Sequence, residues 1–236
     1  MSARDTIRLY QTTEHACGYW PERRARDLVL DPSAPEIARV YPAALGQGFR
    51  RSGGHVYRPN CGSCQACVPV RIAVDDFIAT RSHRRVLRRA SQWNVSDRST
   101  DAAPEVFALY RQYLKARHLH GGMDDASPQD FENFVRCEWS PTRFLCILDD
   151  TAELRAVAVT DITSEGLSAV YTFFDPDFSR FSLGTLGILQ QIDWARRLSL
   201  PHVYLGFWLE GHPKMHYKRN FPALEARIDG SWRRLT

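Results

Sequence analysis

The 236-residue sequence lacks an apolar run long enough to cross a bilayer, because its longest, at 183–192, falls well short of the ~20 residues needed. Residues 1–11 lack the apolar segment of a secretory signal peptide. Repeats and low-complexity tracts are absent, and 44% hydrophobic and 25% charged residues are close to the globular average. The sequence therefore predicts a cytoplasmic globular protein of one large or two small domains that does not act at a membrane.

Lysine is also scarce, since only three of the 31 basic residues are lysines. The net charge of +4 is unevenly spread, because residues 1–98 carry 16 basic and 9 acidic residues whereas residues 99–236 carry 15 and 18. A basic first half favours an anionic partner, most often a nucleic acid. The alternative is a general preference for arginine, with scattered side chains on a solvated surface.

Residues 81–89 concentrate this charge on one stripe of a predicted helix. No acidic residue lies between positions 77 and 96, and apolar residues supply a face to bury. Five like charges repel each other unless an anion meets them, and a guanidinium binds phosphate bidentately. The stripe predicts binding of a nucleic-acid phosphate backbone over a plain solvated face, through Arg81, Arg84, Arg85, Arg88 and Arg89.

The hydrophobic pattern predicts an α+β fold. In the first half we expect short strands, one of them at 55–58, and helices at 33–45, capped by Ser33, and at 79–92. Beyond them the pattern predicts helices at 106–118 and 128–139 and strands at 143–148, 154–162 and 167–175. A helix at 183–198, a strand at 202–208 and a hairpin that turns at Asp229-Gly230 follow. This order is similar to that of the GNAT (acyl-CoA N-acyltransferase) fold. We expect a small cysteine-bearing α/β domain at 1–98 and a GNAT-like mixed sheet with helices at 99–236.

Four of the six cysteines are candidate metal ligands. Cys61, Cys64 and Cys67 form C-x-x-C-x-x-C, and Cys17 lies upstream. Such spacing suits a structural zinc ion or an iron–sulfur cluster, with free thiols as the alternative. The remaining Cys137 and Cys146 fall in apolar patterns and are predicted to be core residues.

Five motifs, in the right order over nearly the whole chain, resemble those of the aminoacyl-tRNA–protein transferases, in their bacterial leucyl-transferring branch. They are CGYWPERRARDLVLDP (17–32), GFRRSGGHVYRPNCGSCQACVPVRI (48–72), SHRRVLRR (82–89), YTFFDPDFSRFSLGTLGIL (171–189) and HVYLGFWLEGHPKMHYKRNFPALE (202–225). The resemblance implies transfer of leucine from leucyl-tRNA to the free α-amino group of proteins that begin with Asp or Glu, which marks them for degradation.

The arginyl branch of the family has C-G-Y-C where this sequence has C-G-Y-W, so Trp20 replaces one expected ligand. This departure favours leucyl over arginyl transfer. An arginyl-tRNA–protein transferase, a coenzyme A dependent N-acetyltransferase and a metal-stapled RNA-binding module without enzymatic activity are the alternatives. The segment RFSLGTLG departs from the acetyltransferase signature, so the sequence favours the coenzyme A dependent N-acetyltransferase less than aminoacyl transfer.

Aminoacyl-tRNA is an activated ester, so the reaction requires neither a covalent nucleophile, ATP nor a cofactor. In a GNAT-like sheet the acyl group lies where two parallel strands diverge, here 171–175 and 204–208. The start of the following helix is a natural phosphate site for the tRNA end, through Ser182, Gly184 and Thr185. Close helix–sheet packing is the alternative role for the glycines at 184 and 187.

The remaining candidates serve the acceptor and the chemistry. For the acidic N-terminus we expect Arg50, Arg51 and Lys214, with Arg58 as a further candidate. The catalytic candidates are Asp175, Tyr217 and Lys218; Lys214 and Lys218, four residues apart, are expected to face one site. Asp175, His212 and His216 are all open as general bases, and Phe173, Phe174, Phe207 and Trp208 as the lining of a leucyl pocket.

Overall fold

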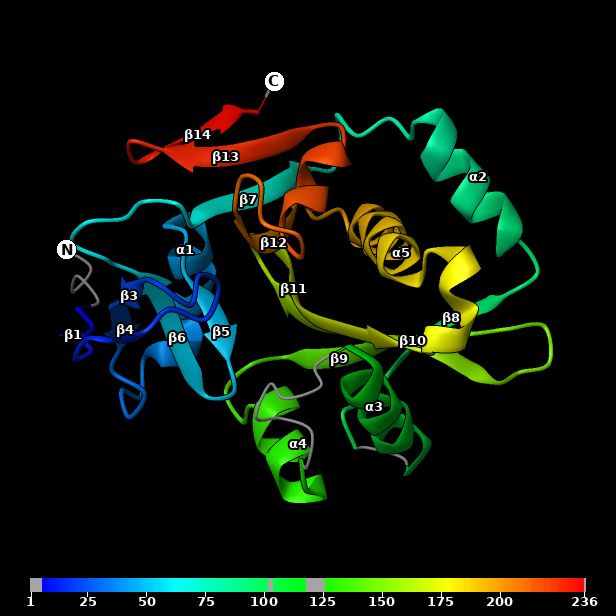
Figure 1. The fold of residues 1–236 in the computed structure, drawn as a ribbon, viewed down its shortest axis with the longest axis horizontal. Helices are drawn as coiled ribbons and strands as arrows, with labels where there is room; N and C mark the ends of the chain where they lie inside the picture. The colour runs from blue at the N-terminus through cyan, green and yellow to red at the C-terminus, as the bar shows by residue number, and fades with distance from the viewer. Residues whose placement is uncertain (1–5, 102–103, 118–125, 236) are drawn as a thin grey trace.

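The computed structural model, drawn in Figure 1, describes residues 6–101, 104–117 and 126–235. Its largest element is an eight-stranded sheet in the order β14-β13-β7-β12-β11-β10-β9-β8. Neighbouring strands are antiparallel except for the parallel pair β11–β12. The strands are β7 (Val68–Ala73), β8 (Asn94–Arg98), β9 (Thr142–Leu148), β10 (Leu154–Thr163), β11 (Gly166–Phe174), β12 (His202–Trp208), β13 (Leu224–Ile228) and β14 (Ser231–Arg234). The predicted mixed α+β architecture with a mixed sheet is thereby confirmed.

Helices cover both faces of this sheet (Figure 1). One face packs against α3 (Pro104–Arg117) and α4 (Pro128–Val135), the other against α2 (Arg81–Arg89) and α5 (Leu183–Arg197). The sequence dictates this arrangement, because side chains alternate along a strand: on β9, Phe144 and Cys146 join the α3–α4 core, whereas Leu145 and Ile147 join the α5 core. A sheet that is apolar on both sides must be covered on both sides.

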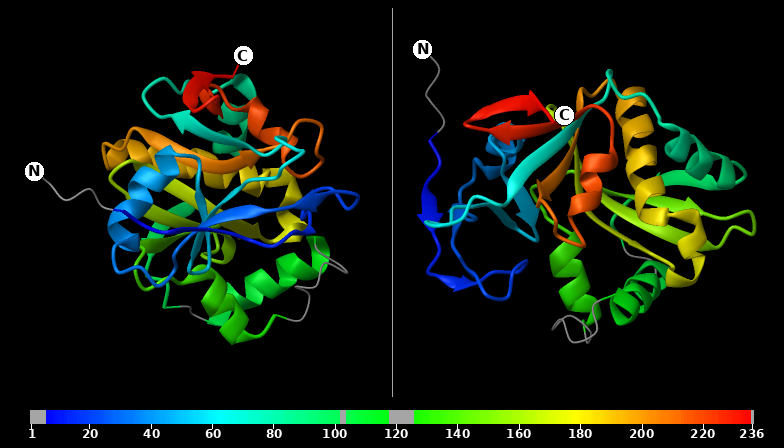
Figure 2. Two further views of the ribbon diagram at one scale, coloured as in Figure 1. Left: turned by 90° about the vertical axis from the view of Figure 1, so that its left-hand side faces the viewer. Right: turned by 45° about the horizontal axis from the view of Figure 1, so that its top comes forward.

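A smaller sheet, in the order β1-β4-β6-β5, lies beside the large one (Figure 2). Its strands are β1 (Leu9–Gln11), β4 (Asp27–Leu30), β5 (Arg50–Ser52) and β6 (His55–Pro59); α1 (Ile37–Gly46) and the pair β2 (His15–Ala16) and β3 (Arg24–Ala25) accompany it. Its core contains Tyr41, Leu45 and Val56, and also Tyr204 from β12 of the large sheet. The two sheets therefore share a core.

Most sequence-predicted elements are confirmed, with differences at their ends. The order after residue 98 is as predicted, and the final hairpin turns at Asp229 and Gly230, both with positive φ. The first helix begins at Ile37 instead of position 33, because Ser33 hydrogen-bonds Asp31 and caps nothing. The Ser127-capped helix ends at Val135, since the backbone of Arg136 is already extended.

The boundary after residue 98 stays a prediction. Both β7 and β8, which precede it in sequence, lie in the large sheet, and β7 lies between β12 and β13. Within the described ranges, the helices are too short or too polar to cross a membrane.

Candidate active site between diverging strands

The parallel strands β11 and β12 separate shortly after they pair. Their register contains only Leu167–Val203 and Ser168–Tyr204, although the strands continue to Phe174 and Trp208. The pairing of β12 with β7 shifts register between Tyr204 and Gly206, where Gly206 has a φ of 75°. Such an irregularity bends a strand, so it turns β12 away from β11 and opens the sheet as the sequence predicts.

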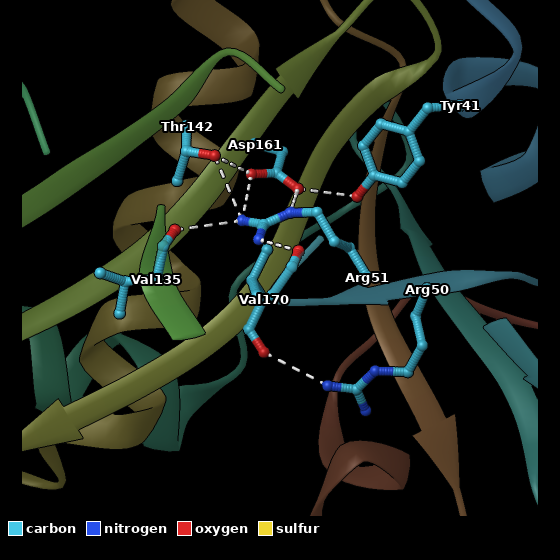
Figure 3. Close-up of polar contacts among 8 residues, drawn as sticks. Tyr41, Arg50, Arg51, Val135, Thr142, Asp161 and Val170 are labelled. Carbon is cyan, nitrogen blue, oxygen red and sulfur yellow. Dashed lines mark hydrogen bonds and ion pairs between the residues drawn. The ribbon is translucent and has the colours of Figure 1, made fainter. Parts of the chain in front are cut away.

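Arg50, on β5, extends from the small sheet into this opening (Figure 3). Its Nη2 donates to the carbonyl of Val170 on β11 (3.3 Å), and its guanidinium lies 5.6 Å from the centre of the Phe207 ring on β12. A Cβ at Gly206 would come within 2.9 Å of Nη1, so only glycine leaves room for the guanidinium. Arg50 thus contacts both diverging strands.

Phenols interact electrostatically with Arg50, among them Tyr19, Tyr57 and Tyr217. Tyr57 stands opposite Arg50 in the β5–β6 register, and burial raises the pKa of Tyr19 to about 12, with the positive charge of Arg50 opposing the shift. Tyr217 is 41% exposed. No carboxylate among the described residues forms an ion pair with Arg50. A desolvated guanidinium without a counter-ion is suited to an incoming anion.

Arg51, predicted to bind the same acidic group, points away from Arg50 (Figure 3). Its Nε and Nη2 each lie 2.8 Å from an oxygen of Asp161 on β10, and both side chains have no exposed surface. Adjacent residues of a strand face opposite sides, which explains why the two arginines have different surroundings. Arg51 is occupied inside the protein and cannot contact a substrate.

Lys218 lies in the 3₁₀ helix η2 (His216–Asn220) and is 5% exposed. Its Nζ donates to the carbonyl of Phe207, whose opposite residue on β7, Pro69, has no N–H to offer. Burial, with the positive charge of Arg50 as a smaller cause, holds the pKa of Lys218 well below its usual range. A buried amine at the end of β12 is a group suited to proton transfer.

Lys214 and Lys218 do not face one site as the sequence analysis expected. Lys214 is exposed and precedes η2, whereas Lys218 is buried. The backbone N–H of Lys214 donates to Nδ1 of His212, and the other ring nitrogen lies 3.2 Å from the carbonyl of Tyr19. Both ring nitrogens of His212 are thereby engaged, and Nδ1 of His216 accepts from Gly211 N–H.

Asp175 lies at the end of β11 in a network of its own. Its carboxylate accepts from Arg155 (2.9 Å), Gln112 (3.2 Å) and the backbone N–H of Asp177 (3.1 Å), and so caps the 3₁₀ helix η1 (Pro176–Phe181). The side chain is buried and paired with a guanidinium. This geometry is that of a structural carboxylate at the entrance to α5.

The N-terminus of α5 faces the end of β11. Ser182 has a φ of 54° and does not cap the helix with its side chain, so the backbone N–H groups around Gly184 and Thr185 are not satisfied by a cap. The Cβ of a residue at 184 would lie 3.5 Å from the Phe174 ring. Phe174 is the partly exposed aromatic at this end, since Phe173 and Phe207 are core residues and Trp208 is 8% exposed.

The arginine stripe of α2 is confirmed as an exposed surface. All five arginines are exposed, while Val86 and His83 are buried beneath them. Thr80 caps the helix by accepting from His83 N–H. Arg89 donates to the carbonyl of Arg180 in η1, and α2 packs alongside α5, as Figure 2 also shows. The C-terminal end of the stripe is therefore hydrogen-bonded to η1, the segment that directly precedes α5.

The four candidate cysteines are not gathered into a ligand set. Burial raises the pKa of Cys67 to about 12, and the thiols of Cys17, Cys61 and Cys64 act on it in the same direction. The Cys64 sulfur accepts from Arg23 (3.5 Å), and the Cys61 thiol donates to the carbonyl of Arg26. All six cysteines are free thiols, and no three His, Cys, Asp or Glu side chains in the described part of the chain form a metal-binding group.

The sequence analysis did not include Tyr19 and Tyr57 in the site. The position of Tyr57 beside Arg50 could have been predicted from the sequence, because a two-residue turn at Gly53-Gly54 places residue 50 opposite residue 57. Tyr19 had no such signal, since its approach to Arg50 depends on tertiary packing.

Two family models match the chain. The model described as the N terminus of arginine-tRNA-protein transferase matches residues 15–85, and that of its C terminus matches residues 105–228. Among solved structures, that of L-PGS from Bacillus licheniformis resembles 76% of this chain and 52% of its own, at 9% identity and a TM-score of 0.48. A C-terminal domain of a putative lysylphosphatidylglycerol synthetase from Agrobacterium fabrum gives 13% identity and a TM-score of 0.47.

Relatives named aspartate/glutamate leucyltransferase are far more similar. The protein of Stenotrophomonas maltophilia (strain K279a) is 54% identical over 97% of this chain and 93% of its own length. The protein of Xanthomonas campestris pv. campestris (strain B100) is 54% identical over 98% of this chain and 94% of its own length. The protein of Xylella fastidiosa (strain 9a5c) is 46% identical over 97% of this chain and 92% of its own length. The chain therefore belongs to the aminoacyl-tRNA–protein transferase family, among the aspartate/glutamate leucyltransferases.

Proposed function

We propose that this protein transfers leucine from leucyl-tRNA to the α-amino group of proteins that begin with Asp or Glu, and so marks them for degradation. Family membership at 54% identity supports the reaction. The structural observation that carries the proposal is Arg50, a guanidinium that forms no ion pair with a carboxylate of the described residues and reaches both diverging strands of the sheet.

Arg50 is proposed to bind the carboxylate of the acceptor's first residue. One of its N–H groups is used on the carbonyl of Val170, which leaves others for a charge-assisted contact with the substrate. Tyr19, Tyr57 and Tyr217 supply a neutral polar wall around it. A neutral amide such as Asn would leave the guanidinium without a counter-charge, which supports selectivity for Asp and Glu.

The tRNA is proposed to lie along α2 and the start of α5. The exposed arginines supply phosphate contacts, and the uncapped N–H groups near Ser182, Gly184 and Thr185 suit a phosphate of the 3′ end. Arg89 ties the two segments together through the carbonyl of Arg180. Phe174, between this helix end and the opening of the sheet, is proposed to contact the leucyl group.

The chemistry is aminolysis of the ester. The attacking amine forms the new amide bond, the bond from the carbonyl carbon to the 3′ oxygen breaks, and one proton passes from the amine nitrogen to that oxygen. The lowered pKa of Lys218 supports a role as the acceptor of this proton, and the hydroxyl of Tyr217 is proposed as a donor to the oxyanion. For Asp175 we propose a supporting role at the entrance to α5.

Further assignments accompany this proposal. The diverging parallel pair and the α5 crossover support a GNAT-like fold for the catalytic part, with the boundary near residue 98 as a working division. Leucyl-tRNA as a substrate supports a cytoplasmic location. The reaction requires no cofactor, and a structural zinc ion or iron–sulfur cluster at Cys17, Cys61, Cys64 and Cys67 would require Cys61 and Cys64 to leave their present partners.

The test is mass spectrometry of an Asp-initiated peptide incubated with the protein and a mixture of charged tRNAs, without ATP. A gain of one leucine residue supports the proposal. A gain of arginine, the amino acid named in both family models, would keep the mechanism and change the donor. No gain, with acetyl-CoA as a separate arm and tRNA binding measured in parallel, would refute aminoacyl transfer.

A further inference from the structure

A buried ion pair joins the small sheet to the large one directly beside the proposed acceptor site (Figure 3). The two oxygens of Asp161, on β10, accept from Nη2 and Nε of Arg51 on β5, each at 2.8 Å. The Tyr41 hydroxyl donates to Asp161 (2.7 Å), as does that of Thr142 (2.7 Å). With every partner inside the protein and no exposed surface, this carboxylate can act on a substrate only through its neighbours.

Arg51 is held at both ends of its fork. Besides Asp161, its Nη1 donates to the carbonyl of Gly53 (2.8 Å) in the β5–β6 turn, and its Nη2 lies 3.2 Å from the hydroxyl oxygen of Thr142. The turn approaches α4 so closely that a Cβ at Gly53 would come within 2.9 Å of the carbonyl oxygen of Asn133. The side chain of Arg51 therefore fixes the position of β5 and the direction of its turn.

The position of β5 decides where Arg50 points. This strand has three residues and lies at the edge of its sheet, so among the described strands it pairs with β6 alone. Because consecutive side chains of a strand face opposite sides, a rotation of β5 that releases Arg51 would also withdraw Arg50. The space at Gly206 and the bond to Val170 accept Arg50 in one position.

Stability alone does not account for such a pair. Removing two charges from water carries a large desolvation penalty, and replacing a buried ion pair by apolar residues of similar volume is often neutral or stabilising. A bidentate guanidinium–carboxylate contact fixes the relative orientation of its two side chains, whereas a dispersion contact between apolar residues does not.

We propose that Asp161, acting through Arg51, is a positioning residue that holds Arg50 in the opening between β11 and β12 and thereby sets selectivity for acidic N-termini. The inference rests on the proposed function. In this inference Asp161 controls the choice of acceptor although it does not contact the substrate. It takes no part in binding tRNA or in proton transfer.

The experiment compares Asp- and Asn-initiated peptides of otherwise identical sequence with the double variant Arg51→Met/Asp161→Leu. We expect a folded protein whose kcat/KM for the Asp peptide falls by up to about 100-fold, the loss that misplacement of a group by about 1 Å can cause. The loss is expected in KM, so the Asp-to-Asn ratio falls, whereas the affinity for leucyl-tRNA stays that of the natural protein. Anisotropy of a labelled Asp peptide gives the same comparison without turnover.

The control is Arg143→Met/Asp97→Leu, which removes an exposed Arg–Asp pair (3.0 Å) between β8 and β9, away from Arg50. It is expected to keep the Asp-to-Asn ratio. If the first double variant does not fold, Arg51→Lys replaces it, because lysine keeps the charge beside Asp161 and loses the bidentate fork.

The outcomes separate the two proposals. An unchanged Asp-to-Asn ratio in a folded Arg51 variant overturns the positioning role of Asp161 and leaves the proposed function in place. Equal use of both peptides by the natural protein would instead overturn the proposed acceptor selectivity, and the inference with it.

Discussion

Replacing three arginines of α2 tests the tRNA surface quantitatively. Arg84 and Arg89 each donate to a backbone carbonyl, whereas Arg81, Arg85 and Arg88 form no ion pair with a described residue and are exposed. The triple variant to alanine, a good helix former, removes three potential phosphate contacts and leaves the buried face of α2 intact.

The expected effect follows from counterion release. Each lost phosphate contact reduces the slope of log affinity against log salt concentration by about 0.7–0.9, so three contacts reduce it by about 2–3. Between 50 and 200 mM salt, the natural protein should lose about 20- to 40-fold more affinity than the variant. Fluorescence anisotropy with labelled tRNA across this range measures both slopes, and circular dichroism checks the fold.

The matched control removes the same charge from other surfaces, as Arg143→Ala/Arg197→Ala/Arg234→Ala, three exposed arginines that pair with carboxylates. Its slope should remain close to that of the natural protein. If both triple variants shift the slope equally, net charge and not α2 governs binding; an unchanged slope in the α2 variant refutes the tRNA contact outright.

Three further predictions concern the opening between β11 and β12. Arg50→Gln should lower kcat/KM for an Asp-initiated peptide by about 30-fold or more, because truncating one partner of a buried charge pair costs about 2 kcal/mol or more. The kcat/KM for an Asn-initiated peptide should remain nearly unchanged. Equal losses for both peptides would refute a contact between Arg50 and the substrate carboxylate. Gly206→Ala should reduce use of the Asp peptide while tRNA affinity is unchanged, because its Cβ would displace Arg50; normal kinetics would show that the guanidinium is not held there. Lys218 has a lowered pKa in the folded state. Between that pKa and the usual value near 10.5, the folded protein therefore binds fewer protons than the unfolded one. The free energy of unfolding should rise with pH across this window. Lys218→Met should abolish this rise in melting temperature and slow transfer; a pH-independent melting temperature in the natural protein would contradict a neutral Lys218.

Local patterns were sufficient for most of the fold. The alternation along β9 and β10 and the Asp229-Gly230 turn are encoded within a few residues, and the structure confirms them. The arginine stripe on α2 was predicted for the same reason, because helical spacing alone puts its members on one face.

Tertiary relations were beyond such reasoning. Arg50 and Arg51 are adjacent and chemically alike, and the sequence gives no sign that one meets Asp161, more than 100 residues away, while the other pairs with no carboxylate in the part of the chain that the structure describes. The burial of Lys218 and the exposure of Lys214 likewise depend on a 3₁₀ turn that begins between them. Asp175 was expected to be catalytic because the sequence does not show that Arg155 and Gln112 reach it.

The central place of β7 in the large sheet has a consequence for synthesis of the chain. A nascent chain releases β7 well over 100 residues before its two neighbours, β12 and β13, which lie within residues 202–228. Both edges of β7 therefore stay unpaired, and prone to aggregate, while that intervening segment is synthesised. Because β12 also forms one wall of the opening that holds Arg50, an interrupted chain would have neither a complete sheet nor an acceptor site.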